Sequence, residues 1–292
     1  MIHFTHNDLD ALGCMLCVHT KFVIKNVYFT NYADFEDRVN DVLKDPDPVL
    51  IISDLSFAER PELLKLLISS KKFVFLIDHH SYSEGFWNNF NYPVTKFKKN
   101  IDPSMCAAKA CYKLLELNNE NLKNLIEIID SYDRWVLNSE LFEKAQILND
   151  WFWENHLTEI FKALKENDFK LPDSYKEESQ KIEEKLNVQM QNAYELKLVQ
   201  KFGPVVFVIG TDVFNRILLK EMSSELPVVV QILGTVFKVR IKKDRFSDFN
   251  LEKIRFTLAQ KVTGHLCAFS YKSNLPVQLE CKRIVETIIE YI

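Results

Sequence analysis

Short apolar runs alternate with stretches of helical periodicity along the first half of the chain. Each run has four or five residues, and the segments between them carry apolar residues at every third or fourth position. The runs predict strands at Ile2–Thr5, Val27–Thr30, Val49–Ile52 and Phe73–Ile77. The periodic segments predict helices at Leu12–Lys25, Phe35–Leu43, Arg60–Ser69, Ser104–Leu117 and Leu122–Ser131, the fourth with Asp102 near its N-cap and Pro103 at its first position. This order is typical of an α/β fold with a parallel, doubly wound sheet.

The pattern changes twice further along the chain. From residue 139 to about residue 200 the sequence is rich in Glu, Lys, Asn and Gln, and Ser174–Gln200 is expected to form one long, solvated helix. Beyond it we expect strands at Val205–Ile209, Val228–Leu233 and Val236–Lys242, and helices at Leu251–Val262 and Lys282–Ile292. We therefore predict three parts: an α/β domain over residues 1–138, a helical connector over 139–200 and a smaller α+β domain over 201–292.

Side chains that bind metal ions follow three of the predicted strands. His6, Asp8 and Asp10 come after the first, Asp54 after the third, and Asp78-His79-His80 after the fourth. In a parallel sheet all the strands end at one edge, where ligands bind, so these side chains should meet. Carboxylates mixed with imidazoles suit Mn, Fe or Mg-like ions, and a group this large suits two of them. This convergence predicts a metal-dependent phosphoester hydrolase.

Each of these clusters also has a plainer interpretation. Asp8 could be an N-cap beside a solvated loop, and Asp54 could be a turn residue. Asp78-His79-His80 is the most specific of the signals, although one member is expected to orient a neighbouring imidazole rather than bind metal itself. A fourth acidic pair, Asp130 and Asp133, leaves open which residue is a ligand and which caps the helix or pairs with Arg134.

A second candidate surface lies in the last third of the chain. Arg240 and Lys242 would share one face of an alternating strand, and Thr263-Gly264-His265 is a tight turn that presents an imidazole. Together they are typical of an anion-binding surface. The plainer alternative is a solvated edge strand and a turn histidine.

Composition limits the classes of partner. The 292 residues are 47% hydrophobic, enough for a sizeable core, and the formal charge of −4 provides no overall attraction to nucleic acid. A polyanion would need a local basic patch or bound metal. Cys14 and Cys17 form a CxxC, but the sequence has no second one, so buried thiols are favoured over a zinc site. No apolar run reaches the roughly 20 residues of a membrane span, and no signal peptide is recognised, so we expect a cytoplasmic protein that does not bind membranes.

These motifs resemble the DHH phosphoesterase superfamily over most of the chain. The resemblance implies a DHH-type catalytic domain over residues 1–138, a connector over 139–200 and a DHHA1-like substrate-binding domain over 201–292. It also implies two metal ions, usually Mn²⁺, with Mg²⁺ or Fe²⁺ as alternatives. The activity that it implies is hydrolysis of a phosphodiester or phosphoanhydride by a water that bridges the two ions.

The family motifs carry over onto specific residues. Asp78, His79 and His80 correspond to the catalytic motif. The implied metal ligands are His6, Asp8, Asp10, Asp54, Asp78, His79 and Asp133. Asp133 is preferred to Asp130 because Leu125–Leu137 is similar to the helix-then-acid segment of the exonuclease branch. The implied substrate-binding residues are His80, Arg240, Lys242, Gly264 and His265.

Two departures from the family pattern bear on the substrate. Many branches place the first histidine four residues before the first aspartate, whereas His6 precedes Asp8 by two, which is closer to the Asp-x-Asp-x-Asp of single-strand exonucleases. The glycine-rich run that normally ends in histidine has also shrunk to Gly264-His265.

The leading hypothesis is a two-metal phosphodiesterase that acts on short oligonucleotides or on linear or cyclic dinucleotides. The acidic net charge favours short substrates, because a processive exonuclease would carry a broad basic groove. The alternatives are a single-strand exonuclease, a small-molecule phosphatase or pyrophosphatase, and a non-catalytic nucleotide-binding protein of the same fold. The last is motivated by the shortened Gly-His motif, whereas the complete set of acidic ligands argues against it.

Overall fold

The computed structural model describes most of the chain, and the described residues form two compact units. The described residues are 1–31, 33–80, 82, 85–89, 96–136, 139–210, 213–223, 226, 228–242, 246–258, 263–265 and 268–291. Unit 1 is Met1–Ile182 and unit 2 is Glu183–Ile292. The finer domain boundaries after residues 138 and 200 stay a prediction.

Unit 1 contains a five-stranded sheet in which all neighbouring strands are parallel. The strands are β1 (Ile2–Thr5), β2 (Asn26–Phe29), β3 (Val49–Ser53), β4 (Phe73–Asp78) and β5 (Phe97–Ile101). Their order is β2-β1-β3-β4-β5. The expected α/β, doubly wound architecture is therefore confirmed.

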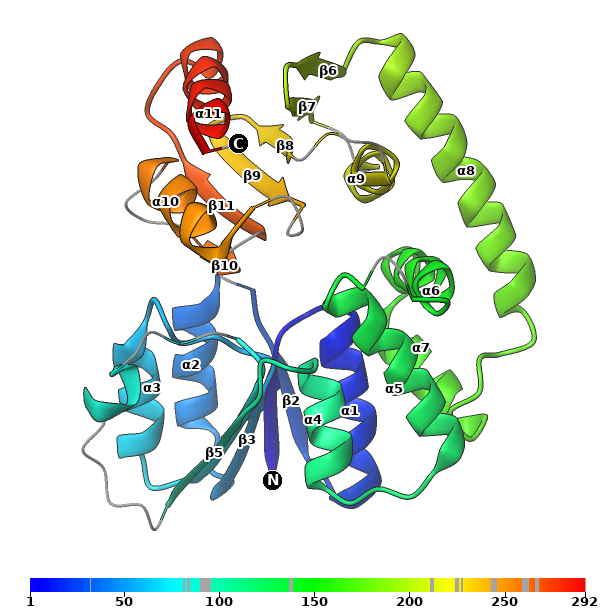
Figure 1. The fold of residues 1–292 in the computed structure, drawn as a ribbon. Coiled ribbons are helices and arrows are strands. Elements are labelled where there is room, and N and C mark those ends of the chain that lie inside the picture. Colours follow the sequence, from blue (N-terminus) through cyan, green and yellow to red (C-terminus); the bar gives the residue numbers. More distant parts are fainter. Residues whose placement is uncertain are drawn as a thin grey trace. The chain divides into compact units, whose positions relative to one another are not determined.

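Helices cover both faces of this sheet (Figure 1). They are α1 (Leu9–Lys21), α2 (Phe35–Lys44), α3 (Pro61–Ser69), α4 (Ala107–Leu114), α5 (Glu120–Asp133), α6 (Phe142–Glu154) and α7 (Leu157–Glu166), and a short 3₁₀ helix, η1, spans Phe86–Asn89. One core packs Ile51 and Ile77 against α1, α4, α5, α6 and α7, and the other packs Leu50 and Ile52 against α2 and α3. Because successive strand residues point to opposite faces, strands buried on both faces are apolar throughout, which explains the unbroken apolar runs.

The strand β5 and the start of α4 differ from the sequence prediction. No strand was expected at β5, because Lys98, Lys99 and Asn100 make it polar, as is common for strands at the edge of a sheet. The fourth helix was expected to start at Ser104, but Asp102 instead accepts a hydrogen bond from the N–H of Ser104 at 2.9 Å in a local turn. The helix therefore begins later, at Ala107.

Unit 2 contains a six-stranded mixed sheet. Its strands are β6 (Val199–Phe202), β7 (Val205–Ile209), β8 (Val228–Leu233), β9 (Val236–Ile241), β10 (Thr263–His265) and β11 (Ala268–Lys272), in the order β10-β11-β9-β8-β7-β6. β7 and β8 are parallel, and the other neighbouring pairs are antiparallel. The helices are α9 (Phe214–Ser223), α10 (Asp248–Leu258) and α11 (Val277–Tyr291), and the long helix α8 (Tyr175–Glu195) begins in unit 1 and ends in unit 2. The expected α+β class of this part is confirmed.

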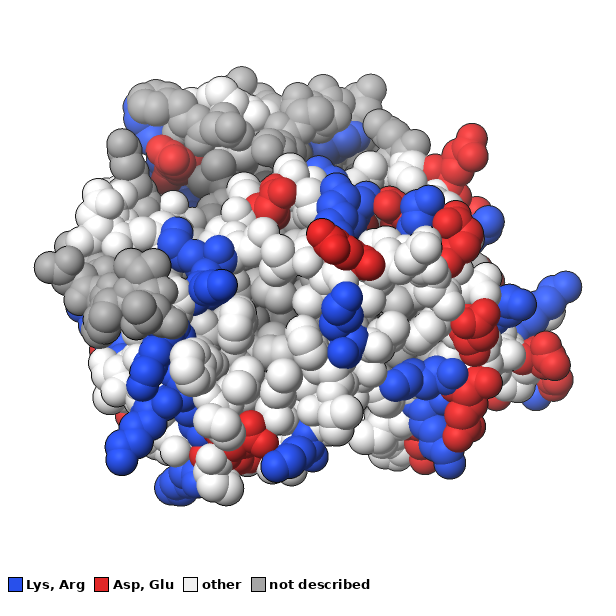
Figure 2. All heavy atoms as spheres, turned by 90° about the horizontal axis from the view of Figure 1, so that it is seen from below, with Lys and Arg blue, Asp and Glu red and all other residues white. Residues whose placement is uncertain are grey.

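The charges on one face and the apolar character of the helices bear on whether the chain could bind a polyanion or cross a membrane. Figure 2 shows one face from below, with an uncharged centre, and Lys and Arg groups interspersed with Asp and Glu groups toward the right of the view. Basic side chains form no continuous band across the centre of this face. Among the described helices, none combines the length and the apolar character needed to cross a bilayer.

The helix α1 packs unusually close to α4 and α5. A Cβ atom added at Gly13 would lie 2.6 Å from Cβ of Ala108 and 3.0 Å from Cδ1 of Ile129. Cys14 and Cys17 on the same helix are fully buried, in line with the expectation that they are small core residues. Gly13 therefore sets the distance between α1 and α4.

We expect Gly13→Ala to destabilise the chain by about 1–3 kcal/mol, the usual cost of overpacking. In an exposed helix the same change would stabilise by about 0.5–1 kcal/mol, so the sign of the effect reports the close contact. Urea denaturation followed by circular dichroism measures it. The exchange Gly13→Ala/Ala108→Gly should recover part of the loss, and a single variant as stable as the parent would contradict the close packing.

Candidate metal centre

The metal-ligand motifs lie at the carboxyl edge of the unit 1 sheet. His6 follows β1, Asp54 follows β3, and Asp78 is the last residue of β4. β1 lies between β2 and β3, so the direction in which the chain fills the sheet reverses there. Doubly wound sheets bind ligands in the crevice outside such a reversal.

His6 and Asp8 form a hydrogen-bonded pair at the start of α1. Nδ1 of His6 lies 2.6 Å from Oδ2 of Asp8, and Oδ1 of Asp8 accepts a hydrogen bond from the N–H of Ala11 at 2.9 Å. Asp8 is therefore the N-cap of α1, as in its plainer interpretation. Burial opposes its charge, but the contact with His6 and the helix N–H outweigh burial and lower the pKa of Asp8 to about 2. This carboxylate is ionised and is available to a cation.

Asp10 joins α1 to the start of α4. Its oxygens accept hydrogen bonds from the N–H groups of Ala107 at 2.9 Å and Ala108 at 2.8 Å, and its side chain is fully buried. The first amides of a helix have no partners within it, so Asp10 supplies a cap that the side chain of Cys106, at the N-cap position, does not. Burial still raises the pKa of Asp10 in spite of these bonds and of nearby His79.

Asp54 adopts a strained backbone conformation at the tip of β3. Its φ of 54° lies in the left-handed region, which costs a non-glycine residue about 1–3 kcal/mol and is common at functional sites. Its N–H donates to the carbonyl of Ile77 at 3.0 Å, which ties β3 to β4. Its Oδ2 is buried and has no hydrogen-bond partner among the described residues. Burial, followed by repulsion from Asp8 and Asp10, raises the pKa of Asp54 far above its usual range.

Asp78 directs both carboxylate oxygens at residues that follow it. Oδ1 accepts from the N–H of His79 at 2.9 Å and lies 2.7 Å from Nδ1 of His80, while Oδ2 accepts from the phenol of Tyr82 at 2.7 Å. Burial opposes the charge, but His80 outweighs burial and lowers the pKa of Asp78 to about 2. Asp78 therefore orients His80, the role expected for one member of this motif. The sequence carried no signal for Tyr82, because no motif links its phenol to Asp78.

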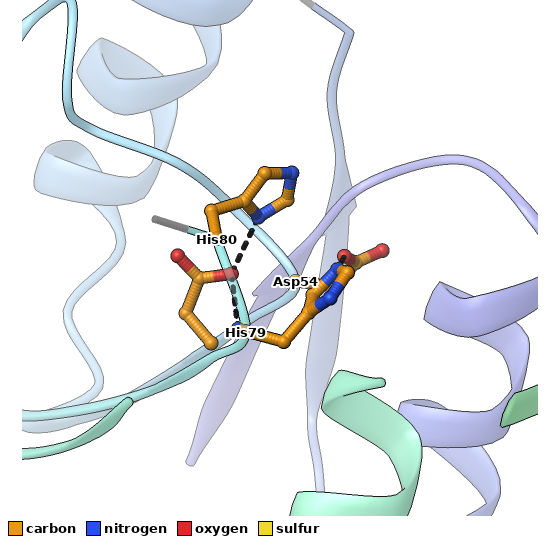
Figure 3. Close-up of side chains that lie close together, drawn as sticks. Asp54, His79 and His80 are labelled. Carbon is orange, nitrogen blue, oxygen red and sulfur yellow. Dashed lines mark hydrogen bonds and ion pairs between the residues drawn. The ribbon is translucent and has the colours of Figure 1, made fainter. Parts of the chain in front are cut away.

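The imidazole of His79 lies among three carboxylates. Its Nε2 is 3.3 Å from Oδ1 of Asp54 and 3.9 Å from Oδ2 of Asp10, and its Nδ1 is 3.5 Å from Oδ2 of Asp133. Figure 3 shows His79 turned toward Asp54, whereas His80 points in another direction. Burial disfavours the cation, but Asp133 and Asp10 outweigh burial and raise the pKa of His79.

The two acids of the fourth motif have different surroundings. Asp130 accepts from the N–H of Cys106 at 2.7 Å and from the ammonium of Lys109 at 2.9 Å, so it connects α5 to α4. Asp133, at the end of α5, lies beside His79. Burial raises the pKa of Asp133 to about 8, although His79 acts in the opposite direction. The geometry groups Asp133, rather than Asp130, with the other ligand-type side chains.

Ligand-type atoms meet in three groups, two of which contain Asp54. Within each group the atoms lie within 4.8 Å of one another, in the part of the chain that the structure describes. The groups are Asp10, His79 and Asp133; His6, Asp8 and Asp54; and Asp54, Asp78, His79 and His80. The structure thus brings together all seven residues predicted as metal ligands, and His80 with them.

The chemistry of this cluster fits divalent cations. Oδ2 of Asp54 and Oδ2 of Asp133 are buried and make no hydrogen bond to the described residues. A buried carboxylate oxygen without a hydrogen bond is costly, and carboxylates this close repel one another. Cations at the centre would satisfy both oxygens, and oxygen and imidazole ligands suit Mn²⁺ and similar ions.

The predicted substrate-binding residues other than His80 lie in unit 2. Arg240 is in β9, Lys242 follows that strand, and Gly264 and His265 are in β10. Arg240 and His265 are both paired with Ala268 of β11, so they stand in one row across three strands. The side chain of His265 lies outside the described part of the chain.

Neither a family model nor a curated protein sequence matches the chain, but solved structures do. The pGpG-specific phosphodiesterase PggH from Vibrio cholerae has a TM-score of 0.56 at 14% identity, over 99% of this chain and 97% of that one. Exonuclease RecJ bound to manganese has a TM-score of 0.57 at 13% identity, over 99% and 89%. RecJ of Thermus thermophilus in complex with Mn²⁺ has a TM-score of 0.65 at 12% identity, over 100% of this chain and 52% of that one. At these identities the similarities show a shared fold, and it is the fold expected from the resemblance to DHH phosphoesterases.

When a chelator keeps the chain free of metal, we expect its melting temperature to fall as the pH rises from about 5 to about 8. The pKa of Asp133 is about 8 in the folded chain but about 3.9 in an unfolded one, so ionisation over this range favours unfolding. Asp54 acts in the same direction, whereas Asp8 and Asp78, with lowered pKa values, stay ionised throughout. Thermal melts in EDTA at several pH values measure the slope.

Asp133→Asn should flatten this pH profile, because an amide does not ionise. Asp41→Asn, at a half-exposed surface site of α2, is the matched control and should leave the slope unchanged. Saturating Mn²⁺ should raise the melting temperature most at high pH, where protons compete least for the ligands. Stability that increases with pH in EDTA would contradict the buried, mutually repelling cluster.

Proposed function

On the premise of this DHH-type fold, we propose that the chain is a two-metal, Mn²⁺-type phosphodiesterase that hydrolyses short oligonucleotides or linear or cyclic dinucleotides. The observation that carries the proposal is the position of Asp54, which belongs to two of the three ligand groups, one with His79 and the other with His6 and Asp8. A carboxylate shared in this way neutralises part of the charge of both ions.

The ligand groups suggest how two ions would be held. One would be bound by Asp10, Asp54, His79 and Asp133, and the other by His6, Asp8 and Asp54. Such a pair of ions lowers the pKa of a water and clamps the oxygens of a phosphate. The N-cap hydrogen bond from the N–H of Ala11 fixes Asp8 within the second group.

His80 is the residue of the motif best suited to contact the substrate. Asp78 fixes its Nδ1 side, so its Nε2 is directed away from Asp78. Tyr82 holds the other oxygen of Asp78, and burial raises the pKa of that phenol, which keeps it protonated as a donor. When both ring nitrogens are protonated, His80 is therefore pre-oriented to donate a hydrogen bond from Nε2 to a phosphate oxygen as charge develops.

The residues in unit 2 would hold parts of the substrate that are not cleaved. Arg240 offers a planar fork for a phosphate, and Lys242 adds a point charge close by in sequence. Gly264 would let the backbone approach the ligand closely, next to His265. Short substrates are favoured by the net charge of −4, which provides no overall attraction to a long polyanion.

The non-catalytic alternative conflicts with the energetics of the cluster. Asp54 and Asp133 have pKa values far above those of exposed carboxylates, so an apo binding protein would keep a destabilising group of acids without using them. The exonuclease and phosphatase alternatives share the metal site and differ only in the substrate.

A substrate series tests the proposal directly. Hydrolysis is measured with Mn²⁺, and again with EDTA, on dinucleotides, a pentamer, a twenty-nucleotide strand, cyclic dinucleotides and an aryl phosphodiester. We expect metal-dependent cleavage of the short species and little of the long strand. Cleavage of the long strand would assign an exonuclease instead, and cleavage of only mononucleotides or pyrophosphate, added as controls, would assign a small-molecule phosphatase.

Asp54→Asn should lower hydrolysis by at least about a hundredfold and reduce the Mn²⁺ bound per chain. Asparagine tolerates the left-handed backbone of this position, so the fold should survive. Bound metal is measured by elemental analysis after gel filtration, with Asp41→Asn as the surface control. Full activity together with two bound ions in Asp54→Asn would exclude a bridging role for this residue.

Tyr82→Phe should lower kcat by about tenfold while KM and metal content change little, because Asp78 loses one donor and holds His80 less firmly. Tyr28→Phe is a matched control, since that phenol also bonds a carboxylate, Asp45 at 2.9 Å, away from the cluster. Steady-state kinetics and circular dichroism separate the two effects. Equal losses in both variants would mean that Tyr82 has a structural role only.

A further inference from the structure

A cavity of about 370 Å³ lies in unit 1, near the edge at which the strands of the sheet begin. Its lining includes Val49, the first residue of β3, Phe22, which directly follows α1, and Leu114 and Leu115 at the end of α4. The metal-ligand side chains lie at the other edge, where the strands end, and none of them lines this cavity. The volume is at the lower end of the range for small-molecule sites, about 300–1,000 Å³.

One wall of the cavity is a face of the sheet formed by three strands. Ile51 of β3 is paired with Phe75 of β4, which is paired in turn with Lys98 of β5. Ile77, two residues after Phe75, is paired with Asn100. Residues paired across strands, and residues two apart on one strand, point to the same face. These five side chains therefore point to the face that α1 and α4 cover.

The greater part of the lining is apolar, and some of it is in contact with water. Val18 and Ile51 are buried, whereas Phe75 is 38% exposed and Leu114 is 49% exposed. A ligand that covers this phenylalanine and this leucine would remove apolar surface from water, which is favourable. The cavity therefore favours a hydrocarbon chain.

The edge strand β5 contributes polar side chains to the lining. Lys98 is exposed and Asn100 is partly exposed, and neither side chain makes an ion pair or a hydrogen bond to a described residue. Lys99 also borders the cavity, but its ammonium lies over the ring of Trp87, 4.0 Å from the ring centroid. None of the described lining residues is Asp or Glu. An ammonium and an amide NH₂ are both hydrogen-bond donors, so this side of the cavity is complementary to an anion.

We propose that the cavity binds a medium-chain fatty acid, a straight-chain carboxylate of about ten carbons. The carboxylate accepts hydrogen bonds from Lys98 and Asn100, and the hydrocarbon chain lies between the sheet and the ends of α1 and α4. A methylene group takes about as much space as a water molecule, roughly 30 Å³, so the cavity holds at most about twelve carbons. The last carbonyl groups of a helix carry partial negative charge, so the uncharged chain suits the ends of α1 and α4 better than the head group does. This site is separate from the metal centre and does not depend on the proposed hydrolysis.

A chain-length series tests the size of the site. Titration calorimetry of the full chain is performed with hexanoate, octanoate, decanoate and tetradecanoate, each below its critical micelle concentration. Affinity should increase about fourfold for each added methylene up to about ten carbons, the gain expected when each methylene is buried. Tetradecanoate should then bind about as tightly as decanoate, because its additional carbons remain outside. Affinity that increases at the same rate up to tetradecanoate, or no saturable binding of decanoate, would overturn the proposal.

Two substitutions with matched controls locate the hydrocarbon chain and the head group. Leu114→Trp places a larger side chain in the opening and should weaken decanoate binding by about tenfold or more. Leu66→Trp, at a site 51% exposed on α3, is its control and should have no effect. Lys98→Gln should weaken decanoate about threefold and leave decanol binding unchanged, because only the carboxylate pairs with the ammonium. Lys162→Gln, which removes an exposed ion pair with Glu166 on α7, should change neither.

Circular dichroism verifies that each variant is folded. Equal effects of Leu114→Trp and Leu66→Trp would exclude this cavity as the binding site, and unchanged decanoate binding in Lys98→Gln would exclude the assigned head-group position. Analytical ultracentrifugation tests another occupant of the cavity. A dimer that Leu114→Trp dissociates, in a parent chain that does not bind decanoate, would mean that a second copy of the chain covers the cavity, and would overturn the fatty-acid site.

Discussion

Mutual repulsion among carboxylates that crowd together at one edge of the sheet is the constraint on which the rest of unit 1 depends. Asp8, Asp10, Asp54 and Asp133 meet at one edge of a sheet, where burial raises the pKa of the last three. Such a group is stable only if the surrounding structure fixes the side chains and if positive charge offsets the unfavourable free energy of their repulsion. Amides of α1 and α4 and the imidazole of His79 supply part of that charge. Oδ2 of Asp54 and Oδ2 of Asp133 are buried and make no hydrogen bond to the described residues, and they are the strongest argument for cations.

The start of α4 connects the packing of unit 1 to this chemistry. Asp10 and Asp130, from two other helices, accept hydrogen bonds from its first amides. Gly13 lets α1 approach α4 closely enough for Asp10 to reach them. A ligand-type side chain is therefore also a helix cap, so a change that moves α1 relative to α4 would move the metal centre with it. Stability and the geometry of the site are coupled through the same few contacts.

Much of this site could be predicted because its motifs are local. His6, Asp8, Asp54, Asp78 and His79 each follow an apolar run, and parallel strands all end at one edge. Which residue of a motif faces the metal centre, and which one makes a structural contact, could not be predicted in the same way. Asp130 and Asp133 are one turn apart on α5, and only the packing of that helix directs one toward Lys109 and the other toward His79. Tyr82 was not predicted, because its hydrogen bond to Asp78 belongs to no sequence motif.

The sequence by itself determined the alternation of the first four strands with helices, the α/β class and the strand ends that carry ligands, because periodicity and local chemistry are properties of neighbouring residues. Only the tertiary structure decided the edge strand β5, the later start of α4 and the sharing of Asp54 between two ligand groups. It also decided which residues line the cavity beside Lys98 and Asn100. These features depend on which strand lies next to which and in what register, and that is set by contacts between residues far apart along the chain.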